Sequence, residues 1–199
     1  MKIDLLTFFK LVENEAYVVI KPSCNLPDYE LGSDIDIFCY HADRMVEKVS
    51  GFLTNYIDDN TSIVVTDSTS KVHVDFIVNN EINFRFDLYK QLPSYKNISL
   101  KPAYFSSVIE SALARVLSEG EVTTKIKVPS TIDDLILRYV EYHEYYAARP
   151  DKIKHIDFIE SKIANNESER AKMLDKLHYY TALPQVAYRD KTLGERVVE

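Results

Sequence analysis

Five short runs of β-branched and aromatic residues in the first ninety positions are the feature that most limits the possible folds. Three of them, at 62–66, 71–78 and 82–89, are separated only by turn-forming residues. Strands joined by such short turns are typical of antiparallel neighbours in a meander. Two earlier runs, at 17–20 and 34–39, predict two more strands. The N-terminal half is therefore expected to contain a sheet.

Helical periodicity flanks these strands and then takes over. Apolar residues recur at helical spacing over 3–12 and 44–55. Beyond Pro102 the same pattern predicts a helical C-terminal half. The helices expected there cover 104–118, 131–149, 153–165 and 167–181. We expect an α+β protein with a sheet core and flanking helices at 1–100 and a helical subdomain at 101–199.

Charge and composition limit the classes of partner. The 199 residues carry a formal net charge of −7, so no general cationic surface is available for long nucleic acid. No apolar run approaches the about 20 residues that a membrane span requires. Cys24 and Cys39 have no Cys or His neighbours at metal-ligand spacing. A cytoplasmic protein with a small-molecule or protein partner is predicted.

An acidic pair on the strand at 34–39 points to chemistry. Asp34 and Asp36 alternate with apolar residues, so both carboxylates lie on one strand face, about 7 Å apart along the chain. Two like charges this close repel each other unless a cation or donors offset them. Gly32 and Ser33 precede the pair and would let a triphosphate approach the backbone. The pair predicts a site for Mg²⁺ or Mn²⁺.

These residues resemble the nucleotidyltransferase superfamily of the DNA polymerase beta type. That family has a strand, a glycine-serine step, about ten intervening residues and then the pattern Asp-hydrophobic-Asp-hydrophobic. Here the strand is Val18-Val19-Ile20, the step is Pro22-Ser23, and Asp34-Ile35-Asp36-Ile37 matches the acidic pattern. The resemblance implies a nucleotidyltransferase-like mixed sheet. It also implies metal-dependent transfer of a nucleoside monophosphate from a nucleoside triphosphate to a small acceptor hydroxyl or phosphate.

The resemblance also implies a third carboxylate on a later hairpin strand. Asp75 matches that placement, and Asp87 is the alternative. Asp34, Asp36 and Asp75 are thus the expected catalytic residues and metal ligands. The residues expected to contact the nucleotide are Lys21, Ser23, Gly32, Ser33 and Arg85. One departure stands out, because Pro22 has no N–H and a fixed φ at the position of the family's glycine.

The segment 17–39, with Leu26-Pro27 leading to Gly32-Ser33, more narrowly resembles nucleotidyltransferase-like proteins of bacterial surface-polysaccharide biosynthesis. This similarity implies a sugar or polyol phosphate as acceptor. Two other interpretations stay open. One is a catalytically inactive nucleotidyltransferase-like binding module or antitoxin-type partner, which Pro22 favours. The other is a glycosyltransferase whose acidic pair binds a nucleotide sugar through a metal, although the pair occurs early in the chain for that class.

Overall fold

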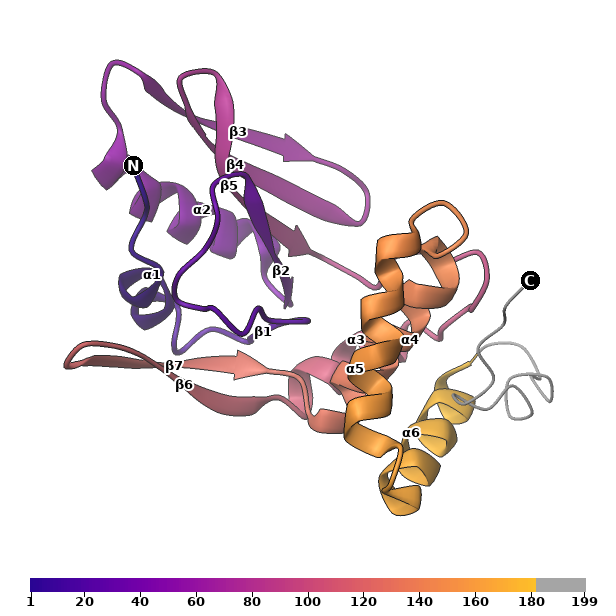
Figure 1. Cartoon of the computed structure of the whole chain (residues 1–199). Coiled ribbons are helices and arrows are strands. Elements are labelled where there is room, and N and C mark those ends of the chain that lie inside the picture. Colours follow the sequence, from indigo (N-terminus) through magenta and orange to yellow (C-terminus); the bar gives the residue numbers. More distant parts are fainter. Residues whose placement is uncertain (182–199) are drawn as a thin grey trace. The chain divides into compact units, whose positions relative to one another are not determined.

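The computed structural model describes residues 1–181, which fall into two compact units (Figure 1). The sheet unit comprises 1–93 and 107–129, and the described part of the helical unit comprises 94–106 and 130–181. Each unit has its own core and is described separately.

A five-stranded mixed sheet forms the centre of the sheet unit, in the order β1-β2-β5-β4-β3. β2 and β5 are parallel, whereas the other neighbouring strands are antiparallel. The strands are β1 (Tyr17–Val19), β2 (Ser33–Cys39), β3 (Thr61–Asp67), β4 (Lys71–Val78) and β5 (Glu81–Tyr89). The meander predicted for the last three strands is confirmed, as is an α+β architecture with a mixed sheet.

A tight turn and a β-bulge together set the register of β4 and β5. Asn79 and Asn80 have φ values of 52° and 65°. Two successive left-handed residues form a type I′ turn, whose twist matches that of a hairpin, and asparagine tolerates this conformation better than most residues. The turn pairs the strand ends, and an irregularity between Phe76 and Ile77 then shifts the register by one residue, which brings Asp75 opposite Arg85.

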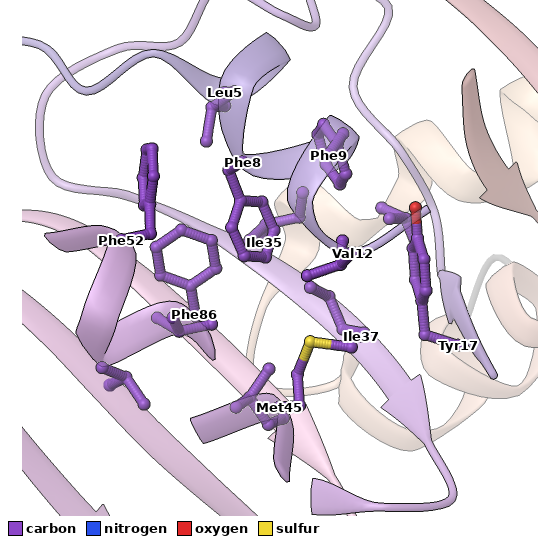
Figure 2. Close-up of a cluster of buried hydrophobic side chains, with 14 of the residues drawn as sticks. Leu5, Phe8, Phe9, Val12, Tyr17, Ile35, Ile37, Met45, Phe52 and Phe86 are labelled. Atoms are coloured by element: carbon purple, nitrogen blue, oxygen red, sulfur yellow. The ribbon is translucent and has the colours of Figure 1, made fainter. Parts of the chain in front are cut away.

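Two helices cover one face of the sheet with apolar side chains (Figure 2). They are α1 (Leu5–Leu11) and α2 (Ala42–Leu53), followed by the short 3₁₀ helix η1 (Thr54–Tyr56). Phe8 of α1 lies 4.8 Å from Phe86 and 5.5 Å from Phe52, measured between ring centroids. Asp4 caps α1 by accepting hydrogen bonds from the N–H groups of Leu6 and Thr7. These helices bury only one sheet face.

The helix predicted at 104–118 is wrong in its second half. α3 ends early (Ala103–Glu110), and the chain then forms a hairpin of β6 (Leu113–Glu119) and β7 (Val122–Val128). Gly120, at φ 58°, lies in the two-residue turn. Leu117 and Ile126 are buried in the sheet unit's core, where the hairpin packs against α1 and β1. The C-terminal half is thus not entirely helical.

The helical unit contains the three remaining predicted helices, which are confirmed with shorter ends. They are α4 (Thr131–Tyr145), α5 (Ile153–Ile163) and α6 (Glu167–Tyr180), with the 3₁₀ turn η2 (Pro150–Lys152) before α5. Ser130 caps α4 by accepting a hydrogen bond from the N–H of Asp133. α4 packs against both α5 and α6. None of the helices in residues 1–181 is long and apolar enough to cross a membrane.

Candidate functional site

Charged side chains form two rows across β2, β5 and β4, on the sheet face opposite α1 and α2. Their apolar neighbours on the same strands are buried in the core, so alternation directs the charged residues to the other face. The first row consists of Asp34, Arg85 and Asp75. The second row consists of Asp36, Asp87 and His73. The acidic pair is therefore part of a wider charged surface.

The approach to Asp34 is shaped by Gly32 and Ser33. Gly32 has φ 83°, and its N–H donates a hydrogen bond of 2.8 Å to the carbonyl of Asn83. This left-handed conformation is the reason why glycine is favoured here. Space is not limiting, because a Cβ added to Gly32 would meet no atom closer than 3.7 Å. The Ser33 hydroxyl donates to the carbonyl of Glu30 at 2.5 Å. Both residues thus organise the turn that starts β2.

Asp36 is the more enclosed member of the acidic pair, with a side chain 20% exposed. Burial raises the pKa of this carboxyl, the ammonium of Lys21 lowers it, and the negative charges of Asp34 and Asp87 raise it further. The net direction is upward although the Lys21 ammonium lies 3.1 Å from an Asp36 oxygen. Burial, the largest cause, together with the two neighbouring carboxylates therefore outweighs the effect of Lys21 on Asp36.

Asp34 is exposed and lies next to Arg85 in the first row. Within residues 1–181 its carboxylate makes no ion pair or hydrogen bond, and its charge contributes to raising the pKa of Arg85. The larger cause of that shift is a hydrogen bond between Arg85 and Asp75. Asp34 thus presents an accessible carboxylate beside an enclosed one.

Asp75, the predicted third carboxylate, is held by Arg85. The guanidinium donates from Nε and Nη2 to the two carboxylate oxygens at 2.5 and 2.9 Å. Asp75 lies on β4, two strands from β2, which corresponds to a backbone separation of roughly 10 Å. Arg85, predicted to contact the nucleotide, is therefore engaged with a carboxylate of its own sheet.

Asp87, the alternative third carboxylate, lies on β5 directly opposite Asp36. It is buried and accepts hydrogen bonds from Lys71 at 2.7 Å and from Nδ1 of His73 at 2.6 Å. Lys71 was missed by the sequence interpretation, although its spacing of two from His73 on β4 places both on the same strand face. Asp87 thus lies between Asp36 on β2 and two basic side chains on β4.

Lys21 and Ser23 occupy the start of the loop after β1. Lys21 has φ 49°, a conformation that costs energy for a residue with a side chain. The Ser23 hydroxyl accepts a hydrogen bond of 3.1 Å from the N–H of Asn25, so it stabilises the loop. Pro22 lies between these two residues, and the Leu26–Pro27 peptide bond further along is cis. Of the two predicted contacts, only Lys21 reaches the acidic pair.

The chemistry of the acidic pair fits a divalent cation. Asp34 and Asp36 share one strand face, so a cation between them would offset the repulsion of their charges. No three side chains of His, Cys, Asp or Glu within residues 1–181 are grouped closely enough to bind a metal together. Asp34 and Asp36 are therefore the residues that could hold the cation, with further ligands supplied by water, by phosphate or by a shift of Asp87.

Comparison with known proteins identified no relative. No protein-family model, no curated protein and no solved structure matches this chain. The function of this chain is therefore inferred from its residues and their geometry.

Proposed function

We propose that this chain is a metal-dependent nucleotidyltransferase that moves a nucleoside monophosphate from a nucleoside triphosphate to a small acceptor hydroxyl or phosphate. The acceptor class we favour is a sugar or polyol phosphate used in surface glycan assembly. This choice rests on the sequence resemblance of the segment 17–39.

The observation that carries the proposal is the placement of the acidic pair. Asp34 and Asp36 share one face of β2, immediately after the left-handed Gly32, and a third carboxylate lies opposite Asp36. The mixed sheet with flanking helices supports the proposal, because the resemblance implied a mixed sheet. Phosphoryl transfer requires positioning and charge neutralisation more than covalent catalysis, which a few carboxylates and cations can supply.

Each residue has a defined role in this proposal. Asp34 and Asp36 would hold Mg²⁺ or Mn²⁺, which when bound neutralises phosphate charge and lowers the pKa of the acceptor hydroxyl. Gly32 leaves the backbone before β2 without a side chain, so a phosphate can approach it closely. The enclosed position of Asp36 keeps the charges near it poorly screened by water. The acceptor then attacks the α-phosphorus in line with the departing pyrophosphate.

For the third acidic position we favour Asp87 over Asp75. Asp87 is on the strand next to β2 and opposite Asp36, whereas Asp75 is one strand further away. Both carboxylates are engaged at both oxygens, Asp75 by Arg85 and Asp87 by Lys71 and His73, so distance decides between them. An aspartate side chain is too short to bridge two strand spacings to a shared cation, whose oxygen ligands lie at roughly 2.0–2.6 Å. Arg85 then acts by holding Asp75 and by balancing the charge of Asp34.

A second candidate function is an inactive nucleotidyltransferase-like binding module. The ion pair between Lys21 and Asp36 favours it, because an ammonium already neutralises the enclosed carboxylate. Pro22 favours it as well, since this residue cannot donate a backbone hydrogen bond to a phosphate.

A thermal-shift experiment separates these functions. The melting temperature would be measured with each of four nucleoside triphosphates and several nucleotide sugars, with and without Mg²⁺ or Mn²⁺. A ligand that binds only the folded state raises its stability, by about 2.7 kcal/mol at a hundred times its dissociation constant. We expect stabilisation by a triphosphate only with metal, and its loss in Asp34→Asn.

The matched control is Asp59→Asn, which removes the same charge from an exposed turn before β3. It should keep the metal-dependent stabilisation of the wild type. Release of pyrophosphate from the stabilising triphosphate then tests for transfer. Stabilisation by a nucleotide sugar alone would instead support the glycosyltransferase interpretation, and no response to any nucleotide would leave the inactive module as the better account.

A further inference from the structure

We infer that Lys21 is a displaceable counter-cation, which neutralises Asp36 while no metal is bound and transfers to a phosphate of the substrate once a metal takes its place. This inference rests on the proposed function, because it concerns the same site. It assigns to Lys21 two successive partners, one in each state of the protein.

The ion pair is placed where a metal would have to bind. The Lys21 ammonium lies 3.1 Å from Oδ2 of Asp36, and the two side chains are 18% and 20% exposed. Both are therefore largely shielded from solvent, and their attraction is less screened than that of a surface pair. A cation that coordinates Asp36 competes with this ammonium for the same carboxylate.

The charges around the pair make displacement by a doubly charged ion favourable. Asp34 lies two positions from Asp36 on the same face of β2, and Asp87 lies directly opposite Asp36 on β5. Lys21 pairs with only one carboxylate of the acidic pair, whereas a divalent ion could also draw on Asp34, which is exposed and makes no ion pair within residues 1–181. Lys21 thus neutralises Asp36 in the time between release of one substrate and binding of the next.

The local chain geometry keeps the ammonium nearby after release. Ile20, the preceding residue, is fixed to β2 by a hydrogen bond of 3.0 Å from its N–H to the carbonyl of Asp36. Lys21 itself has φ 49° and precedes Pro22, so its backbone is restricted on both sides. The flexible four-carbon side chain can then turn without backbone movement. A metal-bound phosphate beside Asp36 would be its next partner.

Amine labelling of the wild-type protein tests this inference. The labelling rate of each lysine would be followed by peptide mass spectrometry, first without metal, then with Mn²⁺ alone, and then with Mn²⁺ and inorganic tripolyphosphate. We expect Mn²⁺ to raise the labelling of Lys21 several-fold and tripolyphosphate to lower it again. Lys90, whose partner Asp67 lies at the far end of β3, should not respond and serves as an internal control.

A binding measurement separates the inference from the proposed function. Mn²⁺ affinity would be measured by electron paramagnetic resonance for the wild type, Lys21→Met and Lys90→Met. Removal of the competing ammonium should tighten Mn²⁺ binding about two- to fivefold in Lys21→Met only. Lys21→Met should also bind tripolyphosphate more weakly in the presence of Mn²⁺.

The outcomes differ for the two claims. If Mn²⁺ binds but the labelling of Lys21 does not change, the inference is wrong and the proposed metal site stands. If Mn²⁺ exposes Lys21 and tripolyphosphate does not protect it, the assignment of phosphate as its second partner is wrong. If neither the wild type nor Lys21→Met binds Mn²⁺, the proposed function fails together with the inference.

Discussion

Asp36 and Asp87 lie directly opposite each other on the parallel strands β2 and β5, so two carboxylates occupy neighbouring positions on an enclosed sheet surface. Burial, Asp34 and Asp87 together raise the pKa of Asp36 more than Lys21 lowers it. Ionisation of Asp36 is consequently less favourable in the folded than in the unfolded chain. This relationship between two residues has a measurable effect on stability.

The first prediction concerns the pH dependence of Asp36→Asn. A carboxyl whose folded pKa is raised stabilises the folded state below its unfolded pKa, which is 3.8, and this contribution is lost as the pH rises through the folded pKa. Asn cannot ionise, so Asp36→Asn should gain stability relative to the wild type between acidic and neutral pH. Chemical denaturation followed by circular dichroism at several pH values measures this difference.

The control for this prediction is Asp28→Asn, for which the change in stability with pH should be opposite in direction. A hydrogen bond from Lys2 lowers the pKa of Asp28, whose contribution to stability is present above the unfolded pKa and lost as the pH falls. Asp28→Asn should therefore lose stability relative to the wild type as the pH rises. A loss of stability at neutral pH in both variants would contradict the predicted environment of Asp36.

Metal affinity should distinguish the two possible third carboxylates. Because Asp87 is opposite Asp36 on the neighbouring strand and Asp75 is one strand further away, we expect Asp87→Asn to weaken Mn²⁺ binding roughly tenfold or more. Asp75→Asn should change the affinity by less than about threefold, since its effect is indirect. Titration of Mn²⁺ against both variants measures this ratio. A larger effect of Asp75→Asn would restore the original sequence-based choice.

The sequence predicted the sheet better than it predicted the site. Strict alternation on β2 located Asp34 and Asp36 on one face, and the turns of the meander gave the order of β3, β4 and β5. The pairing of β2 with β5 was not contained in either pattern, because it joins segments separated by a helix and two strands. The neighbour of Asp36 could therefore not be identified without the structure.

The hairpin of β6 and β7 was missed for a different reason. Residues 104–118 show apolar residues at spacings compatible with a helix, and the actual helix α3 covers the first part of this range. The change of structure at Leu113 depends on contacts with α1 and β1, which bury Leu117 and Ile126. Gly120 followed by Glu121 and then by the β-branched run at 122–128 was the available local signal.

Backbone conformation at Gly32 leads to a prediction about stability. Alanine at Gly32 would require φ near 83°, so Gly32→Ala should destabilise the protein by about 1–2 kcal/mol although space is available for its Cβ. Gly51→Ala is the matched control, because Gly51 lies in α2 with no atom within 4 Å of the added Cβ. That variant should be stabilised by about 0.5–1 kcal/mol. Denaturant titration measures the change in the free energy of unfolding for both variants. Destabilisation by Gly51→Ala would contradict the structure of α2.

A buried ion pair between Lys176 and Asp133 links α6 to the start of α4 in the helical unit. The ammonium lies 2.8 Å from an Asp133 oxygen, and the Asp133 side chain is 0% exposed. Lys176→Met would leave this carboxylate short of its cationic partner in the interior, so we expect a loss of about 2–4 kcal/mol in the free energy of unfolding of the helical unit. Hydrogen exchange of α4 and α6 measures this loss.

The control for this prediction lies one turn away on the same helix. Lys172 pairs with Glu169 at 2.9 Å, with the lysine 61% exposed, so Lys172→Met should change stability by less than about 1 kcal/mol. If α4 is equally protected from hydrogen exchange in Lys176→Met and in Lys172→Met, a structural role for Asp133 is contradicted. Because Ser130 also donates a hydrogen bond to Asp133 at 2.5 Å, the cap of α4 should keep part of its stability in Lys176→Met. The loss should therefore be greatest in α6, whose attachment to Asp133 depends on the lysine.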